Sequence, residues 1–188
     1  MKRSSSTAVV LLLVFSSLLA TNAHALEGQK AARVGVGLEH LGGEASSSAA
    51  HGVIGGGYGL NDWLDLRASG TLARHSFCAV PDDPGCRDHT WHLSLRSSAV
   101  LKLDVIQWIP YAGPALSYHW LLRGPIAKHT HTHDFALGAV VGIGYAPVRT
   151  YGFGVEASYG AFLRNAPDSF QESGIAAIHL YTEYRWGW

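Results

Sequence analysis

The sequence predicts an all-β protein, an eight-stranded antiparallel up-and-down transmembrane β-barrel. Eight runs of residues alternate apolar and polar side chains with a period of two, as strands with two unlike faces do. The connections between the runs alternate between long polar segments and short turns, the arrangement of external loops and periplasmic turns in membrane barrels. Aromatic residues gather near both ends of the runs, at the depths where a bilayer meets water.

The first 25 residues predict an export signal that is removed from the mature protein. Lys2 and Arg3 precede an apolar run, Ala8–Ala20, and Ala23-His24-Ala25 has the small-x-small form of a cleavage site. A retained helical anchor is the alternative, but the run is short for a bilayer that needs about 20 apolar residues. Residues 1–25 are therefore expected to be a signal peptide and residues 26–188 one barrel domain.

Each of the eight runs is expected to form a strand with one apolar and one polar face. They span Ala31–Leu41, His51–Leu60, Trp63–Ser76, His89–Leu103, Trp108–Leu122, Asp134–Ala146, Thr150–Leu163 and Gly174–Trp188. Pro110 and Pro114 make the fifth run the least regular, because proline cannot donate a hydrogen bond to a ladder. A soluble barrel would turn the apolar faces inward, but the aromatic girdles and the loop asymmetry favour apolar faces that meet lipid.

The face opposite the apolar one carries four acidic and four basic residues. An eight-stranded barrel is only wide enough for side chains to fill, so these charges are predicted to pair inside a packed lumen. An ion-conducting pore is the alternative, and it needs a wider, wet interior. The predicted lumenal charge network consists of Arg33, Glu39, Asp65, Arg67, Arg96, Glu156, Glu183 and Arg185.

The composition gives little indication of further binding partners. Lys and Arg together number 14, as do Asp and Glu, so no charge excess points to nucleic acid, and no motif indicates a cofactor. Cys78 and Cys86 lie close together in a chain expected to be exported, which predicts a disulfide across the second external loop. A redox role for the two thiols is the alternative.

Eleven histidines are present, and several cluster. His129, His131 and His133 alternate in the third predicted external loop, where an extended backbone would point all three the same way. Imidazoles suit Zn²⁺, Cu²⁺ or Ni²⁺, so these three residues form a candidate metal site. A solvated polar loop is the alternative. Six more histidines lie at or near strand ends on the same side, His40, His51, His75, His89, His92 and His119.

His92-Leu93-Ser94 matches the His-x-Ser pair of one family of small outer-membrane barrels that removes acyl chains from lipid A. Leu95 stands where that family shows Asn, and both His92 and Ser94 fall on the predicted lumenal face. Lipid A modification is therefore a minor alternative, and no catalytic residue is predicted.

Taken together, the mature chain resembles the small eight-stranded bacterial outer-membrane barrels, the group of OmpX, OmpW and the barrel domain of OmpA. Tyr184, Trp186 and Trp188 in the last run are similar to the C-terminal assembly signal of that group. The resemblance implies a place in the cell outer membrane, contact with its lipid and lipopolysaccharide, and handling by periplasmic chaperones and the barrel assembly machinery. A structural or surface-interaction role is expected, with a narrow channel or binding barrel for small or hydrophobic solutes as the alternative.

Overall fold

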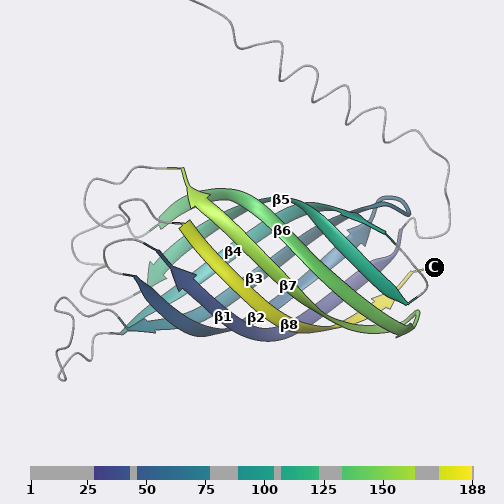
Figure 1. Ribbon diagram of the computed structural model, residues 1–188, viewed down its shortest axis with the longest axis horizontal. Helices are drawn as coiled ribbons and strands as arrows, with labels where there is room; N and C mark the ends of the chain where they lie inside the picture. Colours follow the sequence, from purple (N-terminus) through teal and green to yellow (C-terminus); the bar gives the residue numbers. More distant parts are fainter. Residues whose placement is uncertain are drawn as a thin grey trace, which may run out of the picture.

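The computed structural model describes residues 28–42, 46–76, 89–103, 107–122, 133–163 and 174–187. These residues form eight strands closed into one barrel (Figure 1). Every strand pairs antiparallel with its neighbours in sequence, and β1 pairs with β8 to complete the cylinder. Within those ranges no helix is long and apolar enough to cross a lipid bilayer. The strands are β1 (Lys30–Leu41), β2 (Ser47–Gly59), β3 (Leu64–Ser76), β4 (His89–Lys102), β5 (Trp108–Leu122), β6 (His133–Val148), β7 (Tyr151–Phe162) and β8 (Gly174–Trp186).

The antiparallel eight-stranded barrel predicted from the sequence is confirmed. In Figure 1 one end of the barrel carries the tight connections β2–β3, β4–β5 and β6–β7, and we call it the turn end. At the opposite end lie the last residues of β1, β3, β5 and β7, and we call it the loop end.

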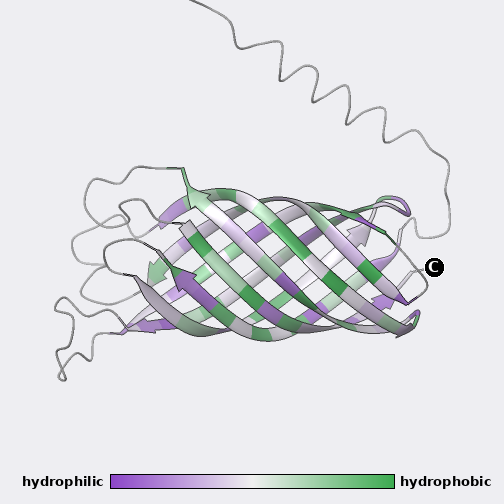
Figure 2. Ribbon diagram, viewed as in Figure 1, coloured by the Kyte–Doolittle hydropathy of each residue, from purple (hydrophilic) through white to green (hydrophobic). Residues whose placement is uncertain are grey.

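Alternating side chains sort by polarity between the outside of the barrel and its lumen. Val36 and Leu180 face outward and are 68% and 65% exposed, whereas Arg67 and Glu183 face the lumen and are 8% and 3% exposed. Colouring by hydropathy shows the same alternation along each strand (Figure 2). Water-soluble barrels bury their apolar face, so this reversed arrangement is that of a barrel surrounded by lipid. The predicted sense of the two faces is confirmed.

Outward-facing aromatic rings, exposed or partly exposed, form two bands, one near each end of the barrel. At the turn end, Trp108 packs on Tyr145 with ring centroids 4.8 Å apart. At the loop end, Tyr118 packs between Trp120 and Phe135, at 4.3 and 4.6 Å. Amphipathic rings are favoured at headgroup depth, so the bands mark the two interfaces of the bilayer.

Two strands extend by more than one residue beyond the bounds predicted from the sequence. β2 begins at Ser47 rather than His51, because residues 47–50 pair with the last four residues of β1. β6 continues through Pro147 to Val148, which pairs with Tyr151 after a register shift. Residues 47–50 are Ser and Ala, which have little strand propensity of their own, and the neighbouring strand supplies the order.

The fifth strand accommodates both of its prolines without ending. The β4–β5 register holds at Ser98–Ala115 and at Leu101–Ala112, and it is interrupted between them, opposite Gly113 and Pro114. A residue without an N–H group fits where the ladder lacks a bond.

Gly142 on β6 shows how the narrow lumen admits large side chains. A β-carbon at this position would collide with the ring of Tyr111. Tyr111 belongs to a buried cluster with Val100, Val140 and Tyr181 in the middle of the lumen. Glycine on the inner face therefore provides the space that the tyrosine ring occupies.

The lipid-facing exterior predicts a depth-dependent cost for an added charge. Val36→Arg places a guanidinium near the middle of β1 and is expected to lower the free energy of unfolding by about 2–4 kcal/mol. Ala32→Arg, nearer the turn end of the same strand, is the matched control, with an expected cost of about 0–1 kcal/mol. Urea unfolding in lipid vesicles, followed by tryptophan fluorescence, measures both. Equal costs at the two positions would contradict a membrane-spanning wall.

Candidate functional site in the barrel lumen

The polar side chains of the lumen form two layers. The arginine layer lies toward the turn end and contains Arg33, Asp65, Arg67, Arg96, Lys102, Tyr111, Glu156, Glu183 and Arg185. The histidine layer lies toward the loop end and contains Glu39, His51, His75, His92, Ser117 and His119. Strand alternation produces both layers, since every member stands on the inward-facing register of its strand.

Glu156 on β7 is the centre of the arginine layer. Its carboxylate pairs with the guanidinium of Arg96 and accepts a hydrogen bond of 2.8 Å from the hydroxyl of Tyr111. The Nη1 atoms of Arg33 and Arg67 lie 3.6 and 3.9 Å from the same carboxylate. Glu156 is 4% exposed, so one buried carboxylate gathers bases from β1, β3 and β4.

Glu183 on β8 forms the second ion-paired centre. Arg33 donates to it from β1, across the seam that closes the barrel, and Arg185 donates from the same strand as Glu183. The guanidinium of Arg33 also lies over the ring of Tyr181, 4.6 Å from its centroid. Such a cation–π contact adds to the stability of a charge removed from water.

Asp65 on β3 anchors the layer nearest the turn end. Lys102 donates to its carboxylate at 2.6 Å and Arg67 at 3.2 Å. The guanidinium of Arg67 lies over the ring of Tyr111, 3.8 Å from the centroid. Each lumenal base thus has a carboxylate or an aromatic face within reach, which a low-dielectric interior requires.

Seven of the eight charged residues assigned to the lumen from the sequence lie in the arginine layer, and Glu39 does not. Among the described residues, the ion pairs of Glu39 all go to histidines. Sequence reasoning omitted Lys102 and Tyr111 from the network. Both share the lumenal face by alternation and could have been found, whereas the bond from the Tyr111 hydroxyl to Glu156 has no signal in the sequence.

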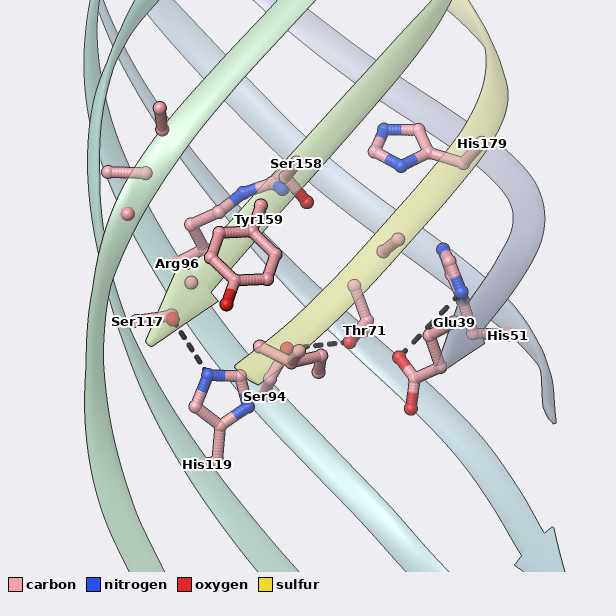
Figure 3. Close-up of a pocket in the computed structure, with 16 residues that line it drawn as sticks. Glu39, His51, Thr71, Ser94, Arg96, Ser117, His119, Ser158, Tyr159 and His179 are labelled. Carbon is pink, nitrogen blue, oxygen red and sulfur yellow. Dashed lines mark hydrogen bonds and ion pairs between the residues drawn. The ribbon is translucent and has the colours of Figure 1, made fainter. Parts of the chain in front are cut away.

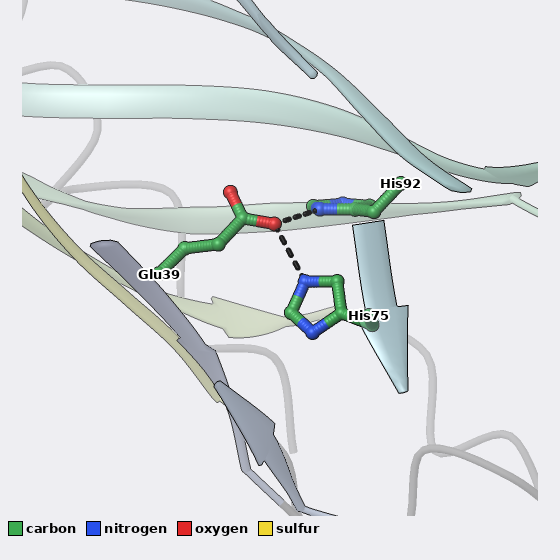
Figure 4. Close-up of side chains that lie close together, drawn as sticks. All are labelled: Glu39, His75 and His92. Carbon is green, nitrogen blue, oxygen red and sulfur yellow. Dashed lines mark hydrogen bonds and ion pairs between the residues drawn. The ribbon is translucent and has the colours of Figure 1, made fainter. Parts of the chain in front are cut away.

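In the histidine layer, Glu39 lies between two imidazoles (Figure 4). Its Oε1 atom is 2.7 Å from Nε2 of His75 and 2.5 Å from Nδ1 of His92. Nδ1 of His51 is 3.7 Å from the other carboxylate oxygen. All four side chains are at most 1% exposed, so the group is closed off from solvent.

A hydrogen-bonded chain leads away from His92. Its Nε2 atom is 3.0 Å from Nδ1 of His119, whose Nε2 is 2.7 Å from the Ser117 hydroxyl (Figure 3). The two imidazoles are stacked, with ring centroids 5.2 Å apart. The Ser117 hydroxyl can donate in turn to the carbonyl oxygen of Ala136, at 3.4 Å. The chain fixes the orientation of both rings.

The His-x-Ser pair lies inside the barrel. His92 and Ser94 are buried on the lumenal face, and the Ser94 hydroxyl is 2.6 Å from that of Thr71 (Figure 3). A pair in this position does not face the acyl chains of a surrounding lipid.

Three of the remaining predicted site residues, His133, Tyr184 and Trp186, lie within the described part of the chain. His133 is exposed at the start of β6, and its ring centroid is 5.9 Å from that of Tyr118. Tyr184 and Trp186 stack on each other on the outer face of β8, 5.7 Å apart. Five others lie outside the described residues: Cys78, Cys86, His129, His131 and Trp188. The loop metal site, the disulfide and the last aromatic of the assembly signal therefore stay predictions.

The lumen has little free space between these side chains. Cavities lined by the described residues measure about 40 Å³ in the histidine layer and about 20 Å³ at each of two places in the arginine layer. A water molecule needs roughly 10–15 Å³ by the same measure, so each cavity holds a few waters at most. The described part of the lumen is therefore a packed core.

Removing one charge at the centre of the arginine layer is expected to destabilise the barrel. Glu156→Gln keeps the shape but leaves three arginines without their shared counter-charge, which is expected to cost about 3–5 kcal/mol in free energy of unfolding. Tyr111→Phe is the control: it removes one hydrogen bond and is expected to cost about 1 kcal/mol. Urea unfolding in vesicles measures both. A Glu156→Gln cost no larger than that of Tyr111→Phe would show that the ion pairs do not stabilise the fold.

Known protein families and curated protein sequences give no match to this chain. Several solved structures match it. Neisserial surface protein A matches with a TM-score of 0.63 at 16% identity, over 84% of this chain and 99% of that one. OprG from Pseudomonas aeruginosa matches with a TM-score of 0.58 at 10% identity, over 86% and 98%. Ail, the attachment invasion locus protein of Yersinia pestis, matches with a TM-score of 0.54 at 12% identity, over 85% and 99%.

Structural similarity at identities this low shows the fold alone. The apolar exterior, the two aromatic bands and the charged, packed lumen add the physical character of the surroundings. Together they show that this chain has the fold of the small eight-stranded β-barrels of the bacterial outer membrane, with an exterior suited to lipid.

Proposed function

We propose that the protein is a closed barrel with a structural or surface-interaction role, exerted through the segments that join its strands at the loop end. These segments are residues 42–46, 77–88, 123–132 and 163–173. The single observation that carries the proposal is the packed lumen, in which ion pairs occupy the space that a solute would need. A barrel closed in this way acts through what it presents outside.

The fold has precedent for such a role. Ail is by name an attachment invasion locus protein, and it shares the closed eight-stranded fold at 12% identity. Loops held by a rigid scaffold are common sites of recognition. The loop end then faces the cell exterior and the turn end the periplasm, as in bacterial barrels generally.

Export and assembly follow from the same proposal. Residues 1–25 serve as the cleaved signal peptide, and residues 26–188 form the barrel domain. Tyr184, Trp186 and Trp188 act as the signal read by the barrel assembly machinery, after chaperones carry the chain across the periplasm. The apolar exterior then contacts lipid and lipopolysaccharide, and a Cys78–Cys86 disulfide ties the 77–88 segment.

Conductance in planar bilayers tests whether the barrel is closed. The folded wild-type protein is expected to give no discrete current steps, because the arginine layer fills the lumen. A variant with Arg33→Ala, Arg67→Ala and Arg96→Ala removes the three long side chains around Glu156 and is expected to conduct. Steady steps from the wild-type protein would instead establish the narrow channel.

Surface display is tested by epitope insertion in living cells. A tag placed within residues 123–132 is expected to bind antibody on intact cells, whereas the same tag between Arg149 and Thr150 is expected to bind only after the outer membrane is opened. Flow cytometry measures both. The opposite pattern would place the turn end outside and remove the basis for the proposed role.

A further inference from the structure

We propose that Glu39, His51, His75 and His92 bind one divalent transition-metal ion of the Zn²⁺ type, beneath the loop end of the barrel. The four residues come from the four consecutive strands β1, β2, β3 and β4. Imidazole nitrogens with one carboxylate oxygen are a donor set that Zn²⁺ accepts. This buried site is independent of the proposed surface role, and its residues are not the loop histidines His129, His131 and His133.

The donor atoms already converge. One atom each from Glu39, His75 and His92 lie within 4.8 Å of one another. Ligands about 2.0–2.1 Å from a tetrahedral Zn²⁺ lie about 3.3 Å apart. The present separations of 2.5 and 2.7 Å from the carboxylate oxygen are those of hydrogen bonds, so an ion requires each imidazole to withdraw by under about 1 Å.

His51 supplies the fourth donor. Its side chain is fully buried, and neither ring nitrogen has a hydrogen-bond partner among the described residues. Its Nδ1 atom is directed at Glu39, 3.7 Å from Oε2, which is too long for a hydrogen bond and close to a ligand–ligand spacing (Figure 3). Buried polar groups without a partner are rare, and a bound ion would give the Nδ1 atom one.

The surroundings of His92 match those of a metal ligand. A histidine that binds a metal through one nitrogen usually donates its other N–H to a protein acceptor, which fixes the tautomer. If Nδ1 of His92 binds the ion, Nε2–H donates to His119, His119 donates to Ser117, and Ser117 donates to the carbonyl oxygen of Ala136. Every donor in this direction has an acceptor, and the chain ends on the backbone.

Charge balance favours a cation at the same place. Glu156 and Glu183 each pair with two or more arginines, whereas the ion pairs of Glu39 within the described part of the chain go to His51, His75 and His92. No Lys or Arg pairs with Glu39 among the described residues, and a divalent ion would place a positive charge directly beside its carboxylate. The alternative is a metal-free cluster held together by the hydrogen bonds between Glu39 and the two imidazoles of His75 and His92.

The ion would join the loop ends of four strands. Glu39 lies two residues from the end of β1, and His75 lies one residue from the end of β3. Binding through β1 to β4 would stabilise the platform from which the connecting segments extend.

Metal binding to the folded, metal-stripped barrel in detergent tests the site. Zn²⁺ retained after gel filtration, measured by mass spectrometry, is expected at one ion per barrel. Co²⁺ is expected to give the intense visible absorption of a tetrahedral site. His92→Gln and Glu39→Gln are each expected to weaken Zn²⁺ binding by more than about 100-fold, because ligands contribute more than the outer-shell groups, which are worth 10–100-fold.

Matched controls exist on the same strands. His40 and His89 are exposed at the same end, on β1 and β4, so His40→Gln and His89→Gln are expected to leave binding unchanged. A triple variant, His129→Asn, His131→Asn and His133→Asn, is expected to keep the buried ion and separates this site from the predicted loop site. Heat-modifiable gel mobility checks that each variant folds.

Three results would overturn the proposal: no Zn²⁺ or Co²⁺ bound by the wild-type barrel, binding lost in the triple loop variant, or binding kept in both His92→Gln and Glu39→Gln. If those two variants do not fold, two other measurements test the site. They are Zn²⁺ binding by His51→Gln, which is expected to be weakened, and the Co²⁺ spectrum of the wild-type protein. None of these results depends on bilayer conductance, so the site and the closed lumen fail or stand separately.

Discussion

Pairing of opposite charges inside a narrow, nearly dry lumen is the constraint on which this barrel depends. Backbone hydrogen bonds join each strand only to its two neighbours, whereas Glu156 on β7 reaches bases on β1, β3 and β4 and a tyrosine hydroxyl on β5. The lumenal charges therefore act as cross-braces between strands that share no ladder. Their desolvation is unfavourable, so each has to be satisfied at once, and this leaves little room for a solute path.

Much of the fold could be predicted because a membrane barrel keeps the period-two alternation of a soluble barrel and only exchanges the inner and outer faces. Period-two alternation sets strands and faces together, and it placed Val36, Leu180 and Phe153 on the lipid side and Arg67 and Glu183 inside. The start of β2 could not be predicted, because Ser47 to Ala50 become a strand only through pairing with β1. Pro147 similarly indicated a turn, but a register shift accommodates it within β6.

The candidate site was less predictable, since alternation assigns a side chain to a face but not to a partner. Glu39 and Glu156 look alike in sequence, yet one meets imidazoles and the other arginines, because their heights along the barrel differ. The histidine signal was visible as a cluster near one end. Its division into buried His75 and His92 and exposed His40 and His89 follows from alternation, whereas the meeting of His75 and His92 with Glu39 follows from strand register, which a single sequence does not specify.

The seam between β1 and β8 has a consequence for how the chain folds. Arg33 and Glu183 meet across that seam although 150 residues separate them, so the contact forms only when the cylinder shuts. Until then Arg33 would lack this counter-charge, and Glu183 would have only Arg185 of its own strand beside it. Insertion and closure must therefore be nearly simultaneous, and a contact of such long sequence separation makes folding slow without assistance. A partly assembled sheet in the bilayer is accordingly disfavoured.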